Sequence, residues 1–329
     1  MSKSIPVLLV LVLAVAAVAL FLKGDSMIYA IQYYNSSFST VNLSNAAPTV
    51  EAVACTDDYS ANDAQVDLNG GTTDVVICNA TVNDMNGVGD LTSTVPKGRF
   101  FENPAKNSAT CTPSSGASNY DCYLNNTCAW LGAKNATAQY VYCRFTVYYN
   151  AKNTSGASDI WYGQINVTDS GFLVGTMNDT IEVGDLLAIG TETPTILFGA
   201  KTAGTNDTTV GTGCGAGCKE NISNQGNIRF DLLINGSNMA CSGASGGTIS
   251  SFYIHANLTD AALYSQSYAL STAASSASAS FTDFDLSPNS TATTERPVAP
   301  GRVVWFGIGI PYGVNGNCQS MVWFTAYQG

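Results

Sequence analysis

Apolar and polar residues alternate with a period of two over several short stretches of this chain. The clearest stretch is residues 138–148, and its predicted buried face consists of Val141, Cys143, Phe145 and Val147. Side chains of a strand point alternately to the two faces of its sheet, so this pattern predicts strands with one buried face. The same alternation occurs in residues 74–82, 160–168, 228–234 and 252–258. Segments rich in Gly, Asn, Asp and Ser separate these stretches, which is typical of sandwiches built from short strands.

The length of 329 residues leaves room for two globular domains after a leader. We therefore expect a mainly β fold: an N-terminal hydrophobic α-helix followed by two β-sandwich domains of the immunoglobulin-like or jelly-roll type. The expected boundaries are 1–45 for the helix and stalk, 46–183 for the first sandwich and 184–329 for the second.

The chain closes with two apolar stretches, residues 303–310 and 321–327, which are joined by a turn at 311–316. This arrangement predicts a C-terminal β-hairpin. Both of its faces are apolar, so one can fill a sandwich while the other needs a different cover. We expect Trp305, Met321 and Trp323 to lie on that second face and to contact another subunit or the partner domain.

The run from Ile5 to Leu22 contains no charged residue and has Lys3 before it and Lys23 after it. As a helix it would span roughly 27 Å, close to the ~30 Å hydrocarbon core of a bilayer. It fits a cleaved secretory signal, an uncleaved membrane anchor, or a helix packed against neighbouring helices in a filament core. We expect the run to be retained.

All ten cysteines follow this run, which indicates a disulfide framework formed in an oxidising compartment. They are Cys55, Cys78, Cys111, Cys122, Cys128, Cys143, Cys214, Cys218, Cys241 and Cys318. Cys78 and Cys143 fall on predicted buried faces, so a disulfide between two sheets is one possible pairing. Trp130 and Val141 do not match the immunoglobulin pattern, so the prediction is a sandwich and not a true immunoglobulin domain. Residues 103–136 are expected to be a disulfide-bonded loop, and Cys214 and Cys218 to form a local bond.

The formal net charge of −11 argues against nucleic-acid binding, and only 11% of the residues are charged. Neutral polar residues and glycans must then keep the surface soluble. The sequence Asn-x-Ser/Thr, the acceptor for N-linked glycans, occurs throughout the exported part. The candidate sites are Asn35, Asn42, Asn79, Asn125, Asn135, Asn153, Asn166, Asn178, Asn206, Asn221, Asn235, Asn257 and Asn289.

No arrangement of residues predicts catalysis. His255 is the only histidine, and it falls on the polar face of its predicted strand with no evident Ser/His/Asp or Cys/His set around it. We expect no enzyme activity and no organic cofactor. A weak candidate for Ca²⁺ is the turn containing Asp84, Asn86 and Asp90, because carboxylate and amide oxygens alternate around Gly87 there. Asp57 and Asp58 are a second weak candidate, and an ordinary Asx-rich turn is the alternative.

Three segments carry a resemblance. They are Pro-Thr-Ile-Leu-Phe-Gly from Pro194, Asn-Gln-Gly-Asn-Ile-Arg-Phe-Asp-Leu-Leu-Ile-Asn-Gly-Ser from Asn224, and Trp-Phe-Gly-Ile-Gly-Ile-Pro-Tyr-Gly-Val-Asn-Gly from Trp305. They resemble the β-sandwich modules of archaeal surface and filament proteins. An apolar helix before β domains also resembles the plan of archaeal pilins and archaellins, although no prepilin-type cleavage site precedes the run.

The resemblance implies a structural subunit of an archaeal extracellular polymer, such as a pilus-like filament, a thread or a surface lattice. Its partners would be copies of itself, with the membrane or neighbouring hydrophobic helices around residues 5–22. The alternatives are an adhesin or binding module tethered to a membrane, and a coat or spike protein of an archaeal virus. All three place the protein outside the cell or at its surface.

Overall fold

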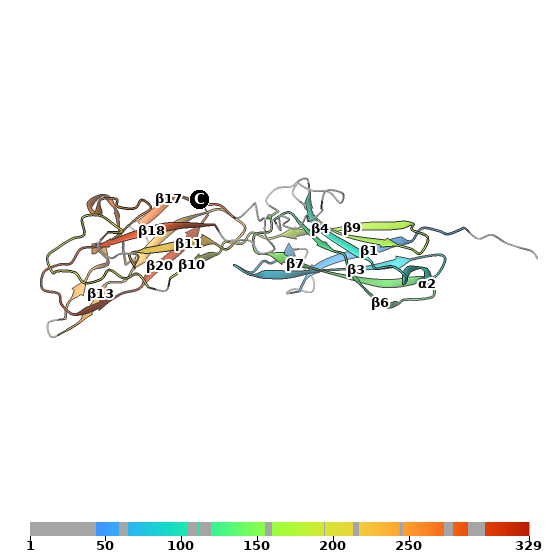
Figure 1. Cartoon of the computed structure of the whole chain (residues 1–329), viewed down its shortest axis with the longest axis horizontal. Coiled ribbons are helices and arrows are strands. Elements are labelled where there is room, and N and C mark those ends of the chain that lie inside the picture. The colour runs from blue at the N-terminus through green and yellow to red at the C-terminus, as the bar shows by residue number, and fades with distance from the viewer. Residues whose placement is uncertain are drawn as a thin grey trace, which may run out of the picture. The chain divides into compact units, whose positions relative to one another are not determined.

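The computed structural model describes residues 44–58, 65–103, 111, 120–154, 160–193, 195–212, 217–243, 246–272, 279–288 and 300–328. These residues belong mainly to β-strands, as expected (Figure 1). Residues Ala46–Gly329 form one compact unit. The predicted N-terminal helix lies outside the described residues. Within the part that is described, no helix is long and apolar enough to cross a bilayer.

Two sheets pack face to face in the N-terminal half of this unit. The first sheet has the order β1 (Thr49–Asp57), β3 (Thr73–Asn83), β7 (Ala138–Tyr148) and β6 (Ala129–Ala133). The second has the order β2 (Gln65–Val66), β9 (Val174–Val183), β8 (Ile160–Thr168), β4 (Lys97–Asn103) and β5 (Cys122–Asn125). Neighbouring strands are antiparallel except for β2 and β9. A single turn of helix, α2 (Val88–Leu91), lies between β3 and β4 and buries Leu91.

The predicted strand patterns of this half are confirmed. Strands β7 and β8 have the predicted bounds, and β3 is one residue longer at each end. Their inward-facing residues are almost fully buried: Val76, Cys78, Ala80, Val82, Val141, Cys143, Phe145, Val147, Trp161, Ile165 and Val167. At the centre, the rings of Phe100 and Trp161 stack with their centroids 4.7 Å apart.

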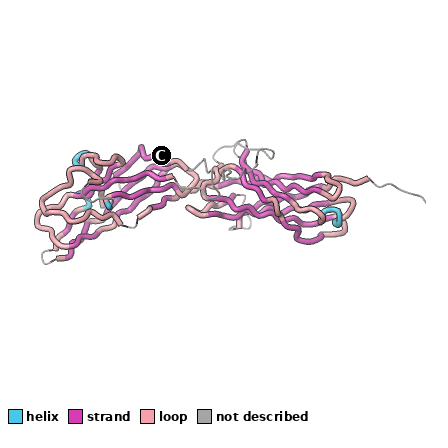
Figure 2. Tube along the Cα trace, in the orientation of Figure 1, coloured by secondary structure: helices cyan, strands magenta, loops and turns pink. Residues whose placement is uncertain are grey.

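Three sheets make up the C-terminal half. The largest has the order β10 (Ile189–Thr191), β11 (Lys219–Asn224), β18 (Gly301–Ile308), β15 (Ile254–Asn257) and β16 (Tyr268–Ala269). A second has the order β17 (Ala279–Leu286), β12 (Phe230–Gly236) and β20 (Val322–Tyr327). The third has the order β14 (Thr248–Ile249), β13 (Met239–Ser242) and β19 (Asn317–Gln319). Two 3₁₀ turns are present: η2 (Ser251–Tyr253) precedes β15, and η3 (Tyr264–Gln266) lies between β15 and β16. Strands dominate the tube view (Figure 2).

Two expectations for this half are wrong. Strands β18 and β20 do not form a hairpin, because β18 pairs with β11 and β15 while β20 pairs with β12 in another sheet. The connection between them contains β19, which pairs with β13. The alternating stretch 252–258 predicts that Phe252, Ile254 and Ala256 face inward. Ile254 and Ala256 are buried, but Phe252 lies in η2 and is 65% exposed.

The buried apolar residues form two large clusters. One draws on residues 50–183 and contains Phe145 and Trp161, and the other draws on residues 218–308 and contains Phe230 and Phe306. Two clusters agree with two sandwiches, and the boundary at residues 183 and 184 stays a prediction.

A buried asparagine of the second half forms hydrogen bonds with backbone groups of the first half and of the residues that follow it. Asn227 is 2% exposed, and its Nδ2 donates to the carbonyl oxygens of Ala151 (3.0 Å) and Gly184 (2.8 Å). The backbone N–H of Leu186 donates to Asn227 Oδ1 at 2.6 Å. One side chain therefore satisfies three backbone groups.

Candidate functional site

In the two disulfides whose cysteines both lie on strands, Cys55–Cys78 and Cys241–Cys318, the bond joins neighbouring strands of one sheet. Among the described residues the disulfides are Cys55–Cys78, Cys111–Cys122, Cys128–Cys143 and Cys241–Cys318. The predicted Cys78–Cys143 bond between sheets is wrong, because β3 and β7 are neighbours in one sheet and each cysteine bonds to the strand on its other side. Cys218 is also disulfide-bonded, and Cys214 lies outside the described residues. The region expected to be a loop, residues 103–136, contains β5 and β6.

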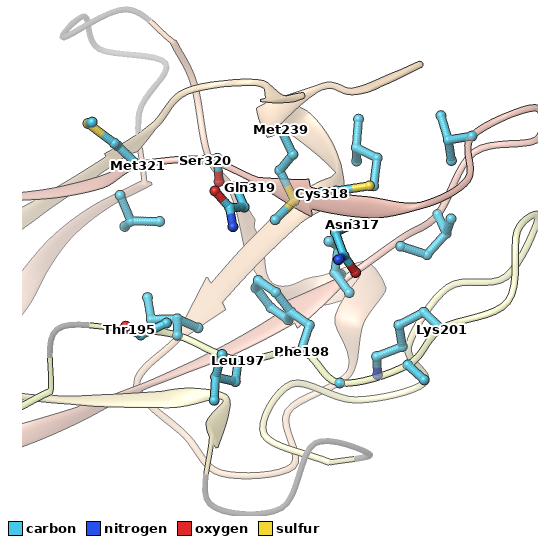
Figure 3. Close-up of a pocket in the computed structure, with 18 of the residues that line it drawn as sticks. Thr195, Leu197, Phe198, Lys201, Met239, Asn317, Cys318, Gln319, Ser320 and Met321 are labelled. Carbon is cyan, nitrogen blue, oxygen red and sulfur yellow. The ribbon is translucent and has the colours of Figure 1, made fainter. Parts of the chain in front are cut away.

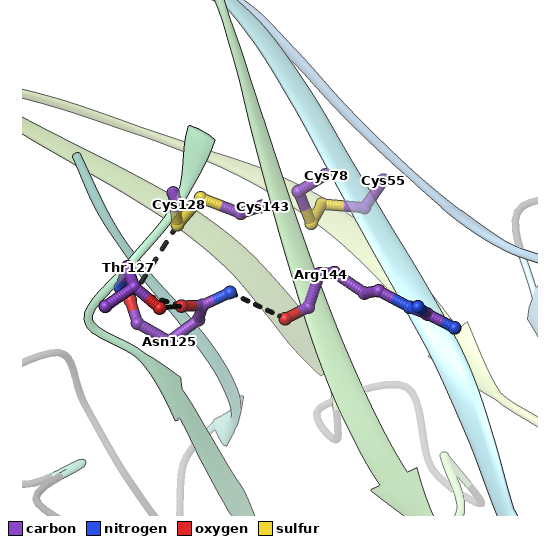
Figure 4. The surroundings of a disulfide bond; sticks show 7 residues. All are labelled: Cys55, Cys78, Asn125, Thr127, Cys128, Cys143 and Arg144. Carbon is purple, nitrogen blue, oxygen red and sulfur yellow. Dashed lines mark hydrogen bonds between the residues drawn. A yellow bond between two sulfur atoms is a disulfide. The ribbon is translucent and has the colours of Figure 1, made fainter. Parts of the chain in front are cut away.

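Four cysteines form a row across the first sheet. Cys55 lies opposite Cys78, Cys78 lies opposite Cys143, and Cys143 bonds to Cys128, which comes just before β6 (Figure 4). The disulfides are buried against the facing sheet.

Glycines of the facing sheet make room for this row. A Cβ atom on Gly98 of β4 would lie 2.8 Å from the Sγ of Cys143, and one on Gly163 of β8 would lie 2.0 Å from the Sγ of Cys55. Both distances are shorter than real contacts allow, so the two sheets approach this closely only because these positions lack a side chain. The cysteine row is a structural feature of the core.

The second half of the unit contains an open groove of about 1280 Å³. One wall is the extended segment 195–203, and the other is the chain from Asn317 to Phe324 (Figure 3). Figure 3 shows Phe198 between the two walls. Core residues Met239, Ile249 and Ile308 also line the groove. Small-molecule sites usually occupy about 300–1,000 Å³, so this groove is larger than most of them.

Acidic side chains fix both ends of the first wall. Glu220 is 2% exposed, and its Oε1 accepts the backbone N–H groups of Glu192 (2.6 Å) and Thr193 (2.9 Å). At the other end Lys201 pairs with Asp207, whose Oδ2 accepts the N–H of Ile308 at 2.9 Å. The segment is therefore held in place although it forms no strand.

Between these anchors the wall presents apolar side chains. Leu197 is 60% exposed, whereas Ile196 and Phe198 are half-buried against the second cluster. The wall therefore combines a fixed backbone with an exposed leucine.

The second wall includes the edge of a sheet. Strand β20 pairs with β12 along one edge, and in the described part of the chain it has no strand partner along the other. An unpaired edge exposes backbone N–H and C=O groups that can pair with another chain. Met321 and Trp323 at this wall are 66% and 46% exposed.

The three residues predicted to take part in self-assembly do not lie together. Met321 and Trp323 line the groove. Trp305 lies on β18 in another sheet, where the Nζ of Lys219 is 5.3 Å from the centroid of its ring and Gly211 approaches the ring. Trp305 and Trp323 do not share a face, because the predicted hairpin does not form.

The structure brings two of the three predicted calcium ligands together and adds a third. One carboxylate oxygen from each of Asp84, Asp90 and Asp169 lies within 4.8 Å of the others. Asn86 points elsewhere, since its Oδ1 accepts the N–H of Ala46 at 2.8 Å. Sequence reasoning missed Asp169, which directly follows β8 as Asp84 directly follows β3.

The described glycan acceptors differ in exposure. The exposed acceptors are Asn79, Asn135, Asn178 and Asn206, and the half-buried ones are Asn125, Asn153, Asn166, Asn221 and Asn257. Asn235 is only 6% exposed, which leaves no room for a glycan in this fold. Asn35, Asn42 and Asn289 lie outside the described residues.

His255 makes contacts typical of a structural histidine. Its Nδ1 lies 2.8 Å from the carbonyl oxygen of Tyr264, so Nδ1 carries the proton and donates it, and its ring stacks on that of Tyr264 at 3.9 Å. Burial lowers the pKa of His255 below its ordinary value.

Comparison with known proteins adds no family. No model of a known protein family matches the chain. No curated protein matches it. One solved structure with some likeness is titled "Chaperone-tip adhesin complex is vital for synergistic activation of CFA/I fimbriae biogenesis". That match is 9% identical, has a TM-score of 0.25 and covers 85% of this chain and 83% of the other. A likeness of this size carries no argument about function.

Proposed function

We propose that this chain is a glycosylated, disulfide-stabilised structural subunit of an archaeal extracellular polymer. The disulfides support a location outside the cytoplasm, because such bonds persist in oxidising compartments. The mainly β fold supports a structural role, and the N-terminal apolar run would place the chain at the membrane or among neighbouring helices.

The observation that carries the proposal is the groove beside β20. It combines the unpaired edge of β20 on the second wall, apolar core residues, and a first wall held by Glu220 and Asp207. Such a groove suits an extended segment that adds a strand to the sheet and places alternate side chains in the groove. In the proposal this segment comes from a second copy of the chain, so that each copy joins the next.

The test is polymer formation by the full chain, followed by sedimentation and negative-stain imaging. Leu197→Asp places a charge in the groove at a residue that is 60% exposed, so the subunit itself should fold. Phe252→Asp is the matched control, because Phe252 is 65% exposed and does not line the groove. We expect Leu197→Asp to remain unpolymerised and Phe252→Asp to assemble as the unmodified chain does.

If both variants assemble normally, the groove is not the contact between copies. If the unmodified full chain stays a single particle under all conditions, the proposal of a polymer is wrong. A singly tethered adhesin then becomes the better hypothesis. Circular dichroism of each variant shows whether a loss of assembly reflects a loss of fold.

A further inference from the structure

The three carboxylates that converge at one end of the first half come from two connections, one between β3 and β4 and one between β8 and β9. Asp84 follows β3, Asp90 lies in α2, and Asp169 follows β8. Asp84 and Asp169 are 1% and 0% exposed, and Asp90 is half-buried. Three acidic groups that are this close and this buried repel one another strongly unless a positive charge joins them.

Local hydrogen bonds orient all three groups. The N–H of Asn86 donates to Asp84 Oδ1 at 2.7 Å, and the N–H of Leu173 donates to Asp169 Oδ1 at 2.8 Å. The hydroxyl of Ser170 donates to Asp90 Oδ1. Each Oδ1 atom thus accepts a hydrogen bond from a loop residue. These bonds orient the three carboxylates toward one another before any ligand binds.

One buried oxygen in this cluster has no partner. Asp84 Oδ2 is inaccessible to solvent and accepts no hydrogen bond. Neither Asp84 nor Asp90 forms an ion pair in the described part of the chain, where the ion pairs are Lys152–Glu102, Lys201–Asp207 and Arg229–Asp285. A buried carboxylate oxygen without a donor is costly, and a metal ion at this position would satisfy it.

We propose that Asp84, Asp90 and Asp169 bind a Ca²⁺ ion. Ca²⁺ takes oxygen ligands at 2.3–2.6 Å, so two ligands on opposite sides of one ion are about 4.6–5.2 Å apart. Three oxygens that all lie within 4.8 Å of one another can therefore bind one Ca²⁺ ion. Mg²⁺ binds its ligands at about 2.0–2.1 Å in a strict octahedron and keeps several of its waters, so a site of three protein carboxylates suits Ca²⁺ better. The ion would join the loop after β3 to the turn between β8 and β9.

The test is direct binding of Ca²⁺ to the full chain, purified in mild detergent with its disulfides intact and stripped with EDTA. Calorimetry should give one site with a Kd on the order of 10⁻⁴ to 10⁻³ M, as in other extracellular modules. At about 10 mM Ca²⁺ the guanidinium unfolding midpoint should rise by about 0.3–1 M over that in EDTA. The same concentration of Mg²⁺ should give less than half of this rise.

The variants Asp84→Asn and Asp90→Asn distinguish a loss of Ca²⁺ binding from a general loss of stability. Without metal each should unfold at a higher guanidinium concentration than the unmodified chain, because one repelling charge is gone. Each should lose at least tenfold in Ca²⁺ affinity. Glu182→Gln is the matched control: Glu182 is exposed in the same half and outside the cluster, so the Ca²⁺ response should be unchanged.

Three outcomes overturn the proposal. They are no saturable Ca²⁺ binding by the unmodified chain, undiminished binding by both cluster variants, and a larger response to Mg²⁺ than to Ca²⁺. None of them bears on the groove, so this proposal and the proposed function fail separately.

Discussion

Gly163 on β8 faces Cys55 on β1 so closely that a Cβ atom at position 163 would lie 2.0 Å from the Cys55 sulfur. The Cys78 sulfur of the same disulfide would be 2.5 Å away. The absence of a side chain at Gly163 therefore allows one sheet to carry a disulfide into a core that the other sheet also fills.

The substitution Gly163→Ala should destabilise the fold by about 1–3 kcal/mol, because the added methyl group overlaps a rigid disulfide in a packed core. Guanidinium unfolding monitored by tryptophan fluorescence measures this loss. Gly89→Ala is the control, since no atom lies within 4 Å of a Cβ there, and we expect a change of less than about 1 kcal/mol. Equal stability of the two variants would show that the sheets separate easily at the cysteine row.

Asn227→Asp should destabilise the fold more than Asn227→Ala does. The aspartate removes the Nδ2 donor and places acceptor oxygens against the carbonyls of Ala151 and Gly184. We expect losses of about 2–4 kcal/mol for the alanine variant. Asn126→Ala, at an exposed position, should change the stability by less than about 0.5 kcal/mol. Denaturant unfolding of the three variants checks the order, and an Asn227→Asp variant as stable as the unmodified chain would contradict it.

Dithiothreitol should reduce Cys241–Cys318 before it reduces the two disulfides of the cysteine row. Cys241 and Cys318 are half-buried, whereas Cys55, Cys78, Cys128 and Cys143 are at most 6% exposed. A thiolate must reach a sulfur atom to attack it, so burial slows the reaction. Alkylation at successive times, followed by mass spectrometry, gives the order. Earlier labelling of Cys55 or Cys143 would mean that the first half opens more readily than the second.

His255 should titrate below its ordinary pKa of 6.5, because burial disfavours the charged ring. In the pH range between 6.5 and the lower folded value, the unfolded chain binds the proton and the folded chain does not. The contribution of His255 to stability is therefore present above pH 6.5 and is lost as the pH falls through this range.

An NMR titration of this single histidine measures its pKa directly. The variant His255→Gln should show a smaller loss of stability over the same pH range. A measured pKa above 6.5 would contradict the prediction.

Strands could be predicted from the sequence wherever one face is buried and the other is solvated. The bounds of β7 and β8 follow directly from alternation, because each strand has an uninterrupted apolar face. Which strands pair is not encoded locally. Strands β18 and β20 are close in sequence and end in different sheets, because β20 pairs with β12 and the intervening β19 pairs with β13.

The disulfide pairing and the acidic cluster could not be predicted in full for the same reason: both depend on which strands lie next to each other. Cys78 and Cys143 were both correctly expected to be buried, but burial does not tell whether two strands face each other or lie side by side. Asp84 and Asp90 lie close in sequence and could be proposed as a pair, whereas Asp169 joins them only because β3 and β8 end near each other. No local sequence pattern predicts the groove, because its two walls come from segments that are far apart in the sequence.

The pairing of Cys241 with Cys318 also has a mechanical consequence. A force applied to the two ends of the chain passes through this disulfide bond. The residues between the two cysteines therefore cannot extend while the bond is intact. The sequence separation is 77 residues. At about 3.3–3.6 Å per extended residue, roughly 250 Å of chain length is withheld from stretching. The proposed polymer of such subunits would therefore resist lengthening under load, and a reducing agent would make that polymer markedly more extensible.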